Sequence, residues 1–209
     1  MLTVINTGEE RTFLQNISWQ LYENLLTEIG DDGKARLSYY QGNLEFMTPL
    51  PVHENYNRQI DRIIIVIAEE LDLNHNVFGS MTIKRPDLAA GKEPDSCYYF
   101  ANESAVRGKT KLDFTQDPPP DLAIEIDITS SSLNQLALYA TLGVGELWRY
   151  DGAELIFYQL QSAKYVVVDR SPIFPMLDPV RVLEFLSECQ TDGVNQAVKN
   201  LRKWVQAQF

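Results

Sequence analysis

The chain has 209 residues, 44% of them hydrophobic and 22% charged, so it can form one sizeable domain with a full core. Its formal net charge of −11 argues against a protein that grips nucleic acid through bulk positive charge. A nucleic-acid enzyme with this balance needs a local basic patch, a metal ion or a partner. No apolar run is long enough for a membrane span, and the first residues do not resemble a signal peptide. Cys97 and Cys189 lack metal-ligand spacing; we expect buried free thiols and a cytoplasmic protein.

The first half of the chain is predicted to contain two helices separated by a hairpin. Ser18 as N-cap and Gly30 as a stop enclose an apolar stripe of helical spacing. The segments "ARLSYY" and "LEFM", joined by "QGN", predict a β-hairpin. Pro49 and Pro51 are expected to break the chain, and a long amphipathic helix is predicted from about His53. The segments "NVFGSMTIK" and "DSCYYFA" then have the composition of strands.

The second half of the chain is predicted to complete a sheet and to end in helices. A loop over about 101–120 precedes a strand over 121–128, and a short helix follows from about Leu133 to Leu142. Three strands come next, "ELWRYD", "ELIFYQL" and "KYVVVD", with "DGA" as a hairpin turn between the first two. The last 30 residues are predicted to form two helices. This order predicts one α+β domain with a mixed sheet.

The predicted strand over 121–128 carries acidic residues on one face. A period of two places Leu122, Ile124, Ile126 and Ile128 on one face, and Asp121, Ala123, Glu125 and Asp127 on the other. Carboxylates two residues apart on one face lie about 7 Å from each other. If they are buried, they repel each other unless they are protonated, paired or bound to a cation. A hydrated, half-exposed acidic face is the alternative.

Two further acids stand where functional sites are often built. Asp95 follows a proline and opens a predicted strand, although a turn aspartate that caps its own backbone is the alternative. Glu54 lies at the start of the long helix, where an acid also compensates the helix dipole. Carboxylates that converge from adjacent strands can hold Mg²⁺, which activates water and stabilises charge on a phosphate. Other catalytic classes have weak support, because His53 and His75 lack an obvious nucleophile partner and no phosphate-binding glycine loop is present.

Several segments of the chain, in this order, resemble the Uma-two (Uma2) family of restriction endonuclease-like proteins in the PD-(D/E)XK nuclease superfamily. They are "GNLEFMTPLPVHENYN", "GSMTIKRPDLAAGKEPDSCYYF", "DPPPDLAIEIDIT", "SLNQLALYATLGVGELWRYDG" and "LIFYQL". The resemblance covers about residues 18–160. It implies an α/β/α core within an α+β fold, in which a restriction-endonuclease-like mixed sheet is flanked by helices, with an N-terminal helix and hairpin. Residues 1–209 are then expected to form a single nuclease-like domain.

The resemblance also implies a set of site residues. Asp95 and Glu125 would be metal ligands for Mg²⁺ or Mn²⁺. Asp121, in a second Pro-Asp, would be a further ligand, and Glu54 would be the helix-borne acid of the site. Asp127 occupies the position of the usual lysine.

Gln135 marks a departure from the family pattern. The family generally places its lysine in the helix after the acidic strand, but here "SLNQLALYATLGV" has Asn134 and Gln135 in place of Asp and Lys. Losing one preorganised electrostatic donor typically lowers the rate by about 10²–10³. Alternatively, Gln135 completes a capping box with Ser132 as N-cap. Lys84 and Arg85 are the nearest candidates in sequence for a replacement cation.

Two function classes therefore stay open. The first is a metal-dependent DNA endonuclease, weakened at Gln135, with DNA as substrate, no membrane partner and a homodimeric state implied by the resemblance. The second is a catalytically inactive nuclease-fold protein that serves as a binding or dimerisation module. The retained carboxylates favour the first class. The missing lysine and the acidic net charge favour the second.

Overall fold

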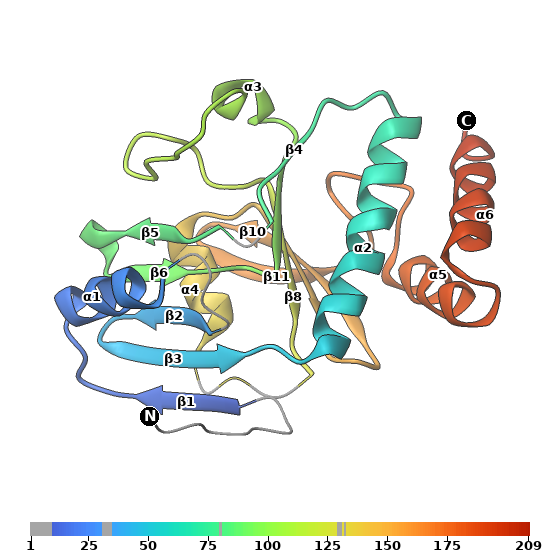
Figure 1. Ribbon diagram of the computed structural model, residues 1–209. Coiled ribbons are helices and arrows are strands. Elements are labelled where there is room, and N and C mark those ends of the chain that lie inside the picture. Colours follow the sequence, from blue (N-terminus) through green and yellow to red (C-terminus); the bar gives the residue numbers. More distant parts are fainter. Residues whose placement is uncertain (1–9, 31–34, 80, 129–130, 132) are drawn as a thin grey trace.

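The computed structural model describes residues 10–30, 35–79, 81–128, 131 and 133–209, and its strands form two sheets (Figure 1). The five-stranded sheet has the order β1-β3-β2-β6-β5, and the six-stranded sheet has the order β11-β10-β9-β8-β7-β4. The first sheet consists of β1 (Glu10–Leu14), β2 (Arg36–Tyr40), β3 (Asn43–Thr48), β5 (Ile83–Arg85) and β6 (Ala90–Lys92). The second consists of β4 (Asn76–Val77), β7 (Ser96–Tyr99), β8 (Leu122–Ile126), β9 (Glu146–Tyr150), β10 (Leu155–Gln161) and β11 (Lys164–Val168).

Helices cover both sheets. They are α1 (Trp19–Ile29), α2 (Pro51–Glu70), the 3-10 helix η1 (Pro86–Leu88), α3 (Glu103–Val106), α4 (Gln135–Leu142), α5 (Pro179–Thr191) and α6 (Val194–Gln206). Helices α2, α5 and α6 contact one another on one side of the six-stranded sheet, while α4 lies on its other side, toward the five-stranded sheet (Figure 1). Helix α1 packs on the outer face of the five-stranded sheet through Tyr22, which meets Leu37, Tyr39 and Leu44. The fold is thus the expected α+β type, extended by a second sheet.

Strand β8 is buried on both faces, which explains its near-continuous run of apolar residues. Leu122, Ile124 and Ile126 join the core formed with α2, α5 and α6. Ala123 faces the other way and packs in the cluster that includes α4. The predicted division of the strand into two faces is therefore confirmed, and the alternative of a half-exposed strand is wrong.

A β-α-β unit gives the centre of the six-stranded sheet its parallel pair. Strands β8 and β9 run parallel, whereas β7 and β10 pair antiparallel to them. A parallel connection needs a crossover, and α4 supplies it. Gly143 ends α4 at a φ of 81°, a left-handed conformation that favours glycine. The crossover brings α4 against the face of β8 that carries Ala123 and Glu125.

Several predicted boundaries hold, and two expectations need correction. Ser18 caps α1 by accepting a hydrogen bond from the Leu21 amide at 3.2 Å, and Gly30 ends that helix. Pro51 does not break the chain but begins α2, because a proline at the first helical position lacks only an amide that has no helical partner. The loop expected over 101–120 contains the short helix α3. Cys97 and Cys189 are buried free thiols, as predicted.

No helix in the described ranges is both long enough and apolar enough to cross a bilayer.

Candidate functional site

The inner face of the five-stranded sheet carries charged side chains toward the six-stranded sheet. Directly opposed residues of neighbouring strands place their side chains on the same face of a sheet. The strand register aligns Arg11, Met47 and Arg36 in one row, and Glu45, Ser38 and Lys92 in the next. Leu37 and Tyr39 alternate with these positions and face α1 instead. The two rows therefore lie between the sheets.

Asp95 directly precedes β7 and lies next to the part of β8 that carries Glu125. The β7–β8 register ends with Ser96 opposite Ile124, and the Asp95 amide donates a hydrogen bond to the Ile124 carbonyl at 3.2 Å. The Asp95 carboxylate is buried, and its Oδ2 accepts a hydrogen bond from the Ile126 amide at 2.6 Å. Its other oxygen, Oδ1, forms an ion pair with the Arg36 guanidinium. The structure thus brings together the two residues that were predicted as metal ligands.

Glu125 has a cation and a hydroxyl as neighbours. Lys92 Nζ lies 3.0 Å from Glu125 Oε2, and the Tyr139 hydroxyl donates a hydrogen bond to Oε1. Burial and the charge of Glu125 raise the pKa of Tyr139 well above its ordinary value, so the hydroxyl remains a donor. Lys92 Nζ also lies 5.9 Å from the centre of the Tyr139 ring. Both charges of the Lys92–Glu125 pair are almost fully buried.

Asp127, at the position of the usual lysine, is held by two arginines. Arg149 Nη2 donates to Asp127 Oδ2 at 2.5 Å, and Arg11 Nη2 donates to Oδ1 at 2.9 Å. Arg11 Nη1 also contacts Glu45 Oε1 at 2.9 Å. Arg149 lies beside Glu125 in the β8–β9 register. The position without a lysine is therefore still surrounded by positive charge.

Gln135 is buried and lies at the start of α4. The helix begins at Gln135 with Asn134 as its N-cap, whose Oδ1 accepts from the Ala137 amide at 3.0 Å. Gln135 is thus the first helical residue and not the fourth residue of a capping box, so that prediction is wrong; Ser132 lies outside the described residues. The Nε2 of Gln135 donates a hydrogen bond to Ser131 Oγ at 3.0 Å, and Ser131 Oγ donates one to Glu45 Oε1 at 2.8 Å. The buried Oε1 of Gln135 has no hydrogen-bond partner.

Asp121 and Glu54 lie apart from this group. Asp121 precedes β8 at the end opposite Asp127, and its carboxylate accepts hydrogen bonds from the amides of Phe100 and Asn102 at 2.6 and 3.0 Å. Glu54 lies on an exposed side of α2 and pairs with Arg58 at 2.6 Å. The residue that α2 does contribute is Asn57, whose Nδ2 donates to the Asp95 carbonyl at 3.1 Å.

Lys92 is a site residue that sequence reasoning missed. The candidates Lys84 and Arg85 lie elsewhere, where Lys84 is 3.6 Å from Glu23 and Arg85 pairs with Asp87. Lys92 lies three residues before Asp95, in the same segment as the Pro-Asp motif, and this proximity in sequence is the signal that could have identified it.

The residues present fit a metal ion with two protein carboxylates. Within the described ranges, no group of three or more His, Cys, Asp or Glu side chains is arranged to hold a metal. Mg²⁺, however, is commonly bound by one or two carboxylates together with waters and substrate phosphates. Asp95 and Glu125 meet that requirement, provided that the ion displaces the basic partners they have here. Asp121 is too far along the strand to join them.

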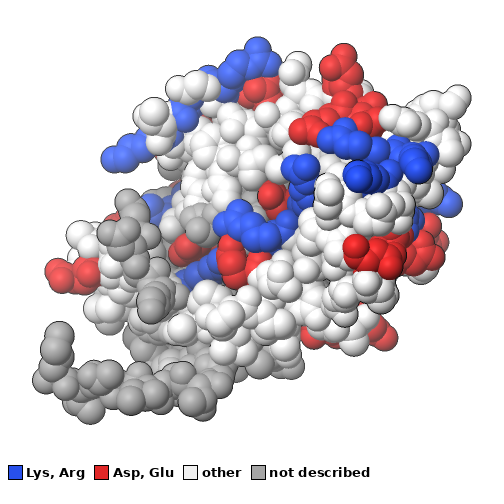
Figure 2. Space-filling view, turned by 45° about the vertical axis from the view of Figure 1, so that its right-hand side comes forward, with Lys and Arg blue, Asp and Glu red and all other residues white. Residues whose placement is uncertain are grey.

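Charges of opposite sign are neighbours on the surface as well. On the face shown in Figure 2, Lys and Arg side chains alternate with Asp and Glu side chains among the coloured residues. Positive and negative side chains are therefore intermixed on this face. DNA binding would then depend on particular basic side chains and not on a broad positive field.

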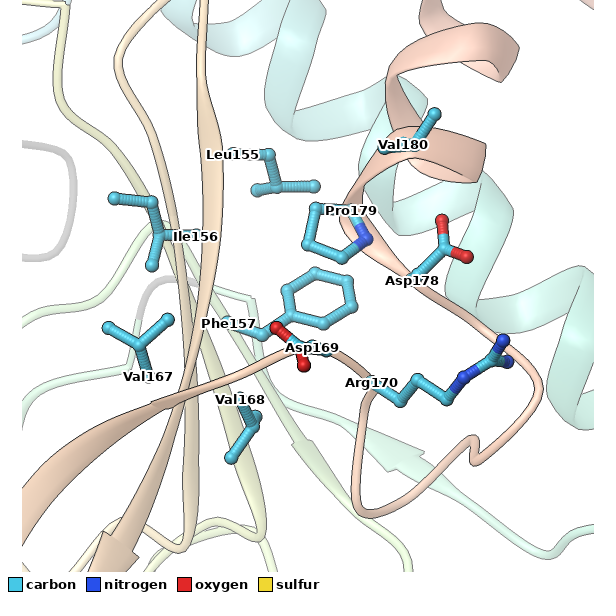
Figure 3. A pocket seen from close by; sticks show the side chains of 10 residues that line it. All are labelled: Leu155, Ile156, Phe157, Val167, Val168, Asp169, Arg170, Asp178, Pro179 and Val180. Atoms are coloured by element: carbon cyan, nitrogen blue, oxygen red, sulfur yellow. The ribbon is translucent and has the colours of Figure 1, made fainter.

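Two pockets lie away from Asp95 and Glu125. One, of about 440 Å³, opens between β10, β11 and α5 (Figure 3). Apolar side chains such as Phe157 and Val167 line it, with Asp169, Arg170 and Asp178 among its polar residues. A second, of about 740 Å³, is lined in part by Asp121. Asp95 and Glu125 line neither of them.

Comparisons with known proteins relate the chain to a protein family and to a solved structure. A model of the Uma2 family, described as "Putative restriction endonuclease", matches residues 19–192. Among solved structures, the chain is similar to the crystal structure of a "putative nuclease belonging to DUF820" from Anabaena variabilis ATCC 29413. The two sequences are 16% identical, the alignment covers 81% of this chain and 90% of that chain, and the TM-score is 0.46. No curated protein matches the chain.

Proposed function

The chain belongs to the Uma2 family, and from this premise we propose that it is a divalent-metal-dependent endonuclease that hydrolyses phosphodiester bonds in DNA. The observation that supports the proposal is that the Asp95 carboxylate is bonded to the amide of Ile126, next to Glu125 in β8, while the ammonium group of Lys92 lies 3.0 Å from Glu125. Carboxylates that can hold a metal ion, with a cation beside them, can assist phosphodiester hydrolysis by activating water and by stabilising charge on the phosphate.

Each residue of the proposed site has a distinct task. Asp95 and Glu125 would hold Mg²⁺ or Mn²⁺, and such an ion, when bound, acts as a Lewis acid and lowers the pKa of a coordinated water. Lys92 supplies a fixed positive charge where negative charge develops on the phosphate. Tyr139 fixes the orientation of Glu125 through its hydroxyl. Gln135 lies one helical turn before Tyr139, on the same side of α4.

Asp121 and Glu54 are left out of the proposed metal site. The Asp121 carboxylate is committed to backbone amides of the segment after β7. Glu54 points to solvent and is paired with Arg58. We therefore assign Asp121 a structural role.

Metal titration tests the assignment directly. Asp95→Asn and Glu125→Gln keep the side-chain shape but remove a ligand charge, so Mn²⁺ affinity measured by calorimetry should fall by about 10–100-fold or more. Asp121→Asn is the matched control and should bind Mn²⁺ as the parent does. Nicking of supercoiled plasmid, followed in parallel, should disappear with the first two variants. An Asp95→Asn variant that binds Mn²⁺ as well as the parent would overturn the site.

A non-catalytic binding module is the second candidate. The observation in its favour is that Asp95, Glu125 and Asp127 each have a basic partner, as in a purely structural ion-pair network. Such a protein would neither nick plasmid nor bind Mn²⁺ at Asp95. The homodimer implied by the resemblance stays a prediction, which sedimentation of the full chain would decide.

A further inference from the structure

Arg36 forms an ion pair with the Asp95 carboxylate, one of the two groups that would hold a metal ion. Asp95 Oδ2 is engaged by the Ile126 amide, so Oδ1 is the oxygen left for a cation, and the Arg36 guanidinium is paired with it. The Asp95 side chain is 2% exposed, whereas that of Arg36 is 12% exposed. A guanidinium and a divalent ion are both cations, so they compete for this oxygen.

The other cations of the site are held differently. Arg11 and Arg149 share Asp127, and Arg11 is also fixed by Glu45. Lys92 lies deep between the sheets, with its side chain 4% exposed. Arg36, in contrast, lies nearer the surface than Lys92 does, and it extends from β2 on a long side chain.

We propose that Arg36 is a displaceable partner of Asp95, which a metal ion releases and which then binds a non-bridging oxygen of the DNA phosphate. The inference rests on the proposed function and adds a positioning residue to it. An ion that neutralised Asp95 and Glu125 would leave the charges of Arg36 and Lys92 uncompensated, and Arg36 is the more exposed of these two cations. A guanidinium forms two parallel hydrogen bonds to a phosphate, so Arg36 is suited to orient it.

This role makes two predictions of opposite sign for one substitution. Arg36→Gln removes the competitor, so Mn²⁺ should bind more tightly, by about tenfold if Arg36 otherwise keeps most of the Asp95 carboxylates occupied. The same substitution removes the phosphate contact, so the affinity for a short DNA duplex in Mn²⁺ should fall by about tenfold or more. A residue that merely held the fold together would weaken both.

The experiment measures Mn²⁺ binding by calorimetry and duplex binding by fluorescence anisotropy, neither of which needs turnover. Arg58→Gln, on the exposed side of α2, removes the same charge away from the site and should match the parent in both. Arg36→Lys keeps the charge without the guanidinium fork; it should fold if Arg36→Gln does not, and it should bind duplex more weakly than the parent while retaining Mn²⁺ binding.

The outcomes test the role of Arg36 separately from the proposed nuclease function. Tighter Mn²⁺ binding together with weaker duplex binding supports the role of Arg36. Weaker Mn²⁺ binding, or unchanged duplex binding, overturns it. A parent that binds Mn²⁺ and duplex but does not nick plasmid would refute the nuclease function, while the Arg36 variants would still decide whether the metal displaces Arg36.

Discussion

Lys92 and Glu125 form an ion pair of 3.0 Å that joins the two sheets, and their side chains are 4% and 3% exposed. The cation comes from the three-residue strand β6 and the carboxylate from the fourth residue of β8. A buried pair of this kind is costly to desolvate, and replacing one partner leaves an uncompensated charge. Removing one partner of the pair should therefore destabilise the fold as well as affect the proposed chemistry.

Lys92→Gln should lower plasmid nicking by about 100-fold or more, because it removes a preorganised positive charge from the site. It should also destabilise the fold by about 3–5 kcal/mol, since Glu125 loses its buried counter-charge. Nicking is compared at a temperature where circular dichroism shows the variant to be folded. Lys84→Gln is the control, because Lys84 is a surface lysine and its loss should cost less than about 1 kcal/mol. Parent-like nicking by the folded Lys92→Gln variant would exclude Lys92 from catalysis.

Much of the fold could be predicted because its elements have strong local signals. Strand β8 alternates with a period of two, and α2 places Ile60, Ile64 and Ile67 on one stripe. The hairpin of β2 and β3 turns at Gln41 and Gly42, both at positive φ, and the "QGN" segment predicts such a turn. These signals act over a few residues and need no knowledge of the rest of the chain.

The missing parts of the site depend on contacts between segments far apart in sequence. β6 spans three residues, which is too short for a periodic pattern, so Lys92 could not be assigned to a strand facing Glu125. Arg36 could be placed in a hairpin strand, but no local signal tells which charge lies across from it. Asp121 and Asp95 have the same Pro-Asp context, yet the Asp95 carboxylate binds the Ile126 amide next to Glu125, whereas that of Asp121 binds the amides of Phe100 and Asn102. Sequence pattern thus identified the acids, and the three-dimensional arrangement selected among them.

Ile64→Ala tests the orientation of α2. Ile64 is fully buried in the core between α2 and the six-stranded sheet, so removal of its side chain should lower the free energy of unfolding by about 2–5 kcal/mol. Val52→Ala, near the start of the same helix and 40% exposed, should change it by less than about 0.5 kcal/mol. Urea denaturation of both variants measures the difference. Equal effects of the two substitutions would contradict the burial of Ile64.

Glu146 should make the stability of the protein depend on pH. Burial raises the pKa of this carboxyl above its ordinary value, although hydrogen bonds from Trp148, Ser171 and the Ile173 amide lower it. The folded protein therefore retains the Glu146 proton to a higher pH than the unfolded chain does. This contribution to stability is fully present below the unfolded pKa and is lost as the pH rises through the folded pKa, with a slope of at most about 1.4 kcal/mol per pH unit.

Urea denaturation at a series of pH values from 4 upward, spaced about half a unit, would reveal this loss. Glu146→Gln has no carboxyl to titrate and should show a shallower decline in the free energy of unfolding over the same range. Glu28→Gln, at an exposed position of α1, should keep the slope of the parent. Parallel curves for the Glu146→Gln variant and the parent would show that Glu146 does not contribute to the pH dependence.

The substitution Gln135→Lys, combined with the loss of Lys92, would move a positive charge of the site from β6 to α4. The Nε2 of Gln135 reaches toward Ser131 and Glu45, and the Oε1 of Gln135 has no hydrogen-bond partner, so a lysine here would lose no acceptor interaction. The cost of a cation in the first turn of a helix is about 0.3–1 kcal/mol. Glu45 offsets part of that cost, because its carboxylate lies next to Ser131. The substitution should therefore be tolerated by the fold.

Gln135→Lys should raise metal-dependent nicking, and it should restore at least part of the activity that Lys92→Gln removes. The reason is that a lysine in the first turn of α4 lies one turn before Tyr139, whose hydroxyl contacts Glu125, so its ammonium group can approach the same carboxylate. Nicking of supercoiled plasmid by the parent, the two single variants and the double variant gives the comparison in Mg²⁺ and in Mn²⁺. Adding Glu125→Ala to Gln135→Lys should abolish any gain, since the introduced lysine acts only beside an intact metal site. A double variant no more active than Lys92→Gln alone would mean that a cation on α4 cannot replace one on β6, and nicking that survives Glu125→Ala would place the activity outside this site.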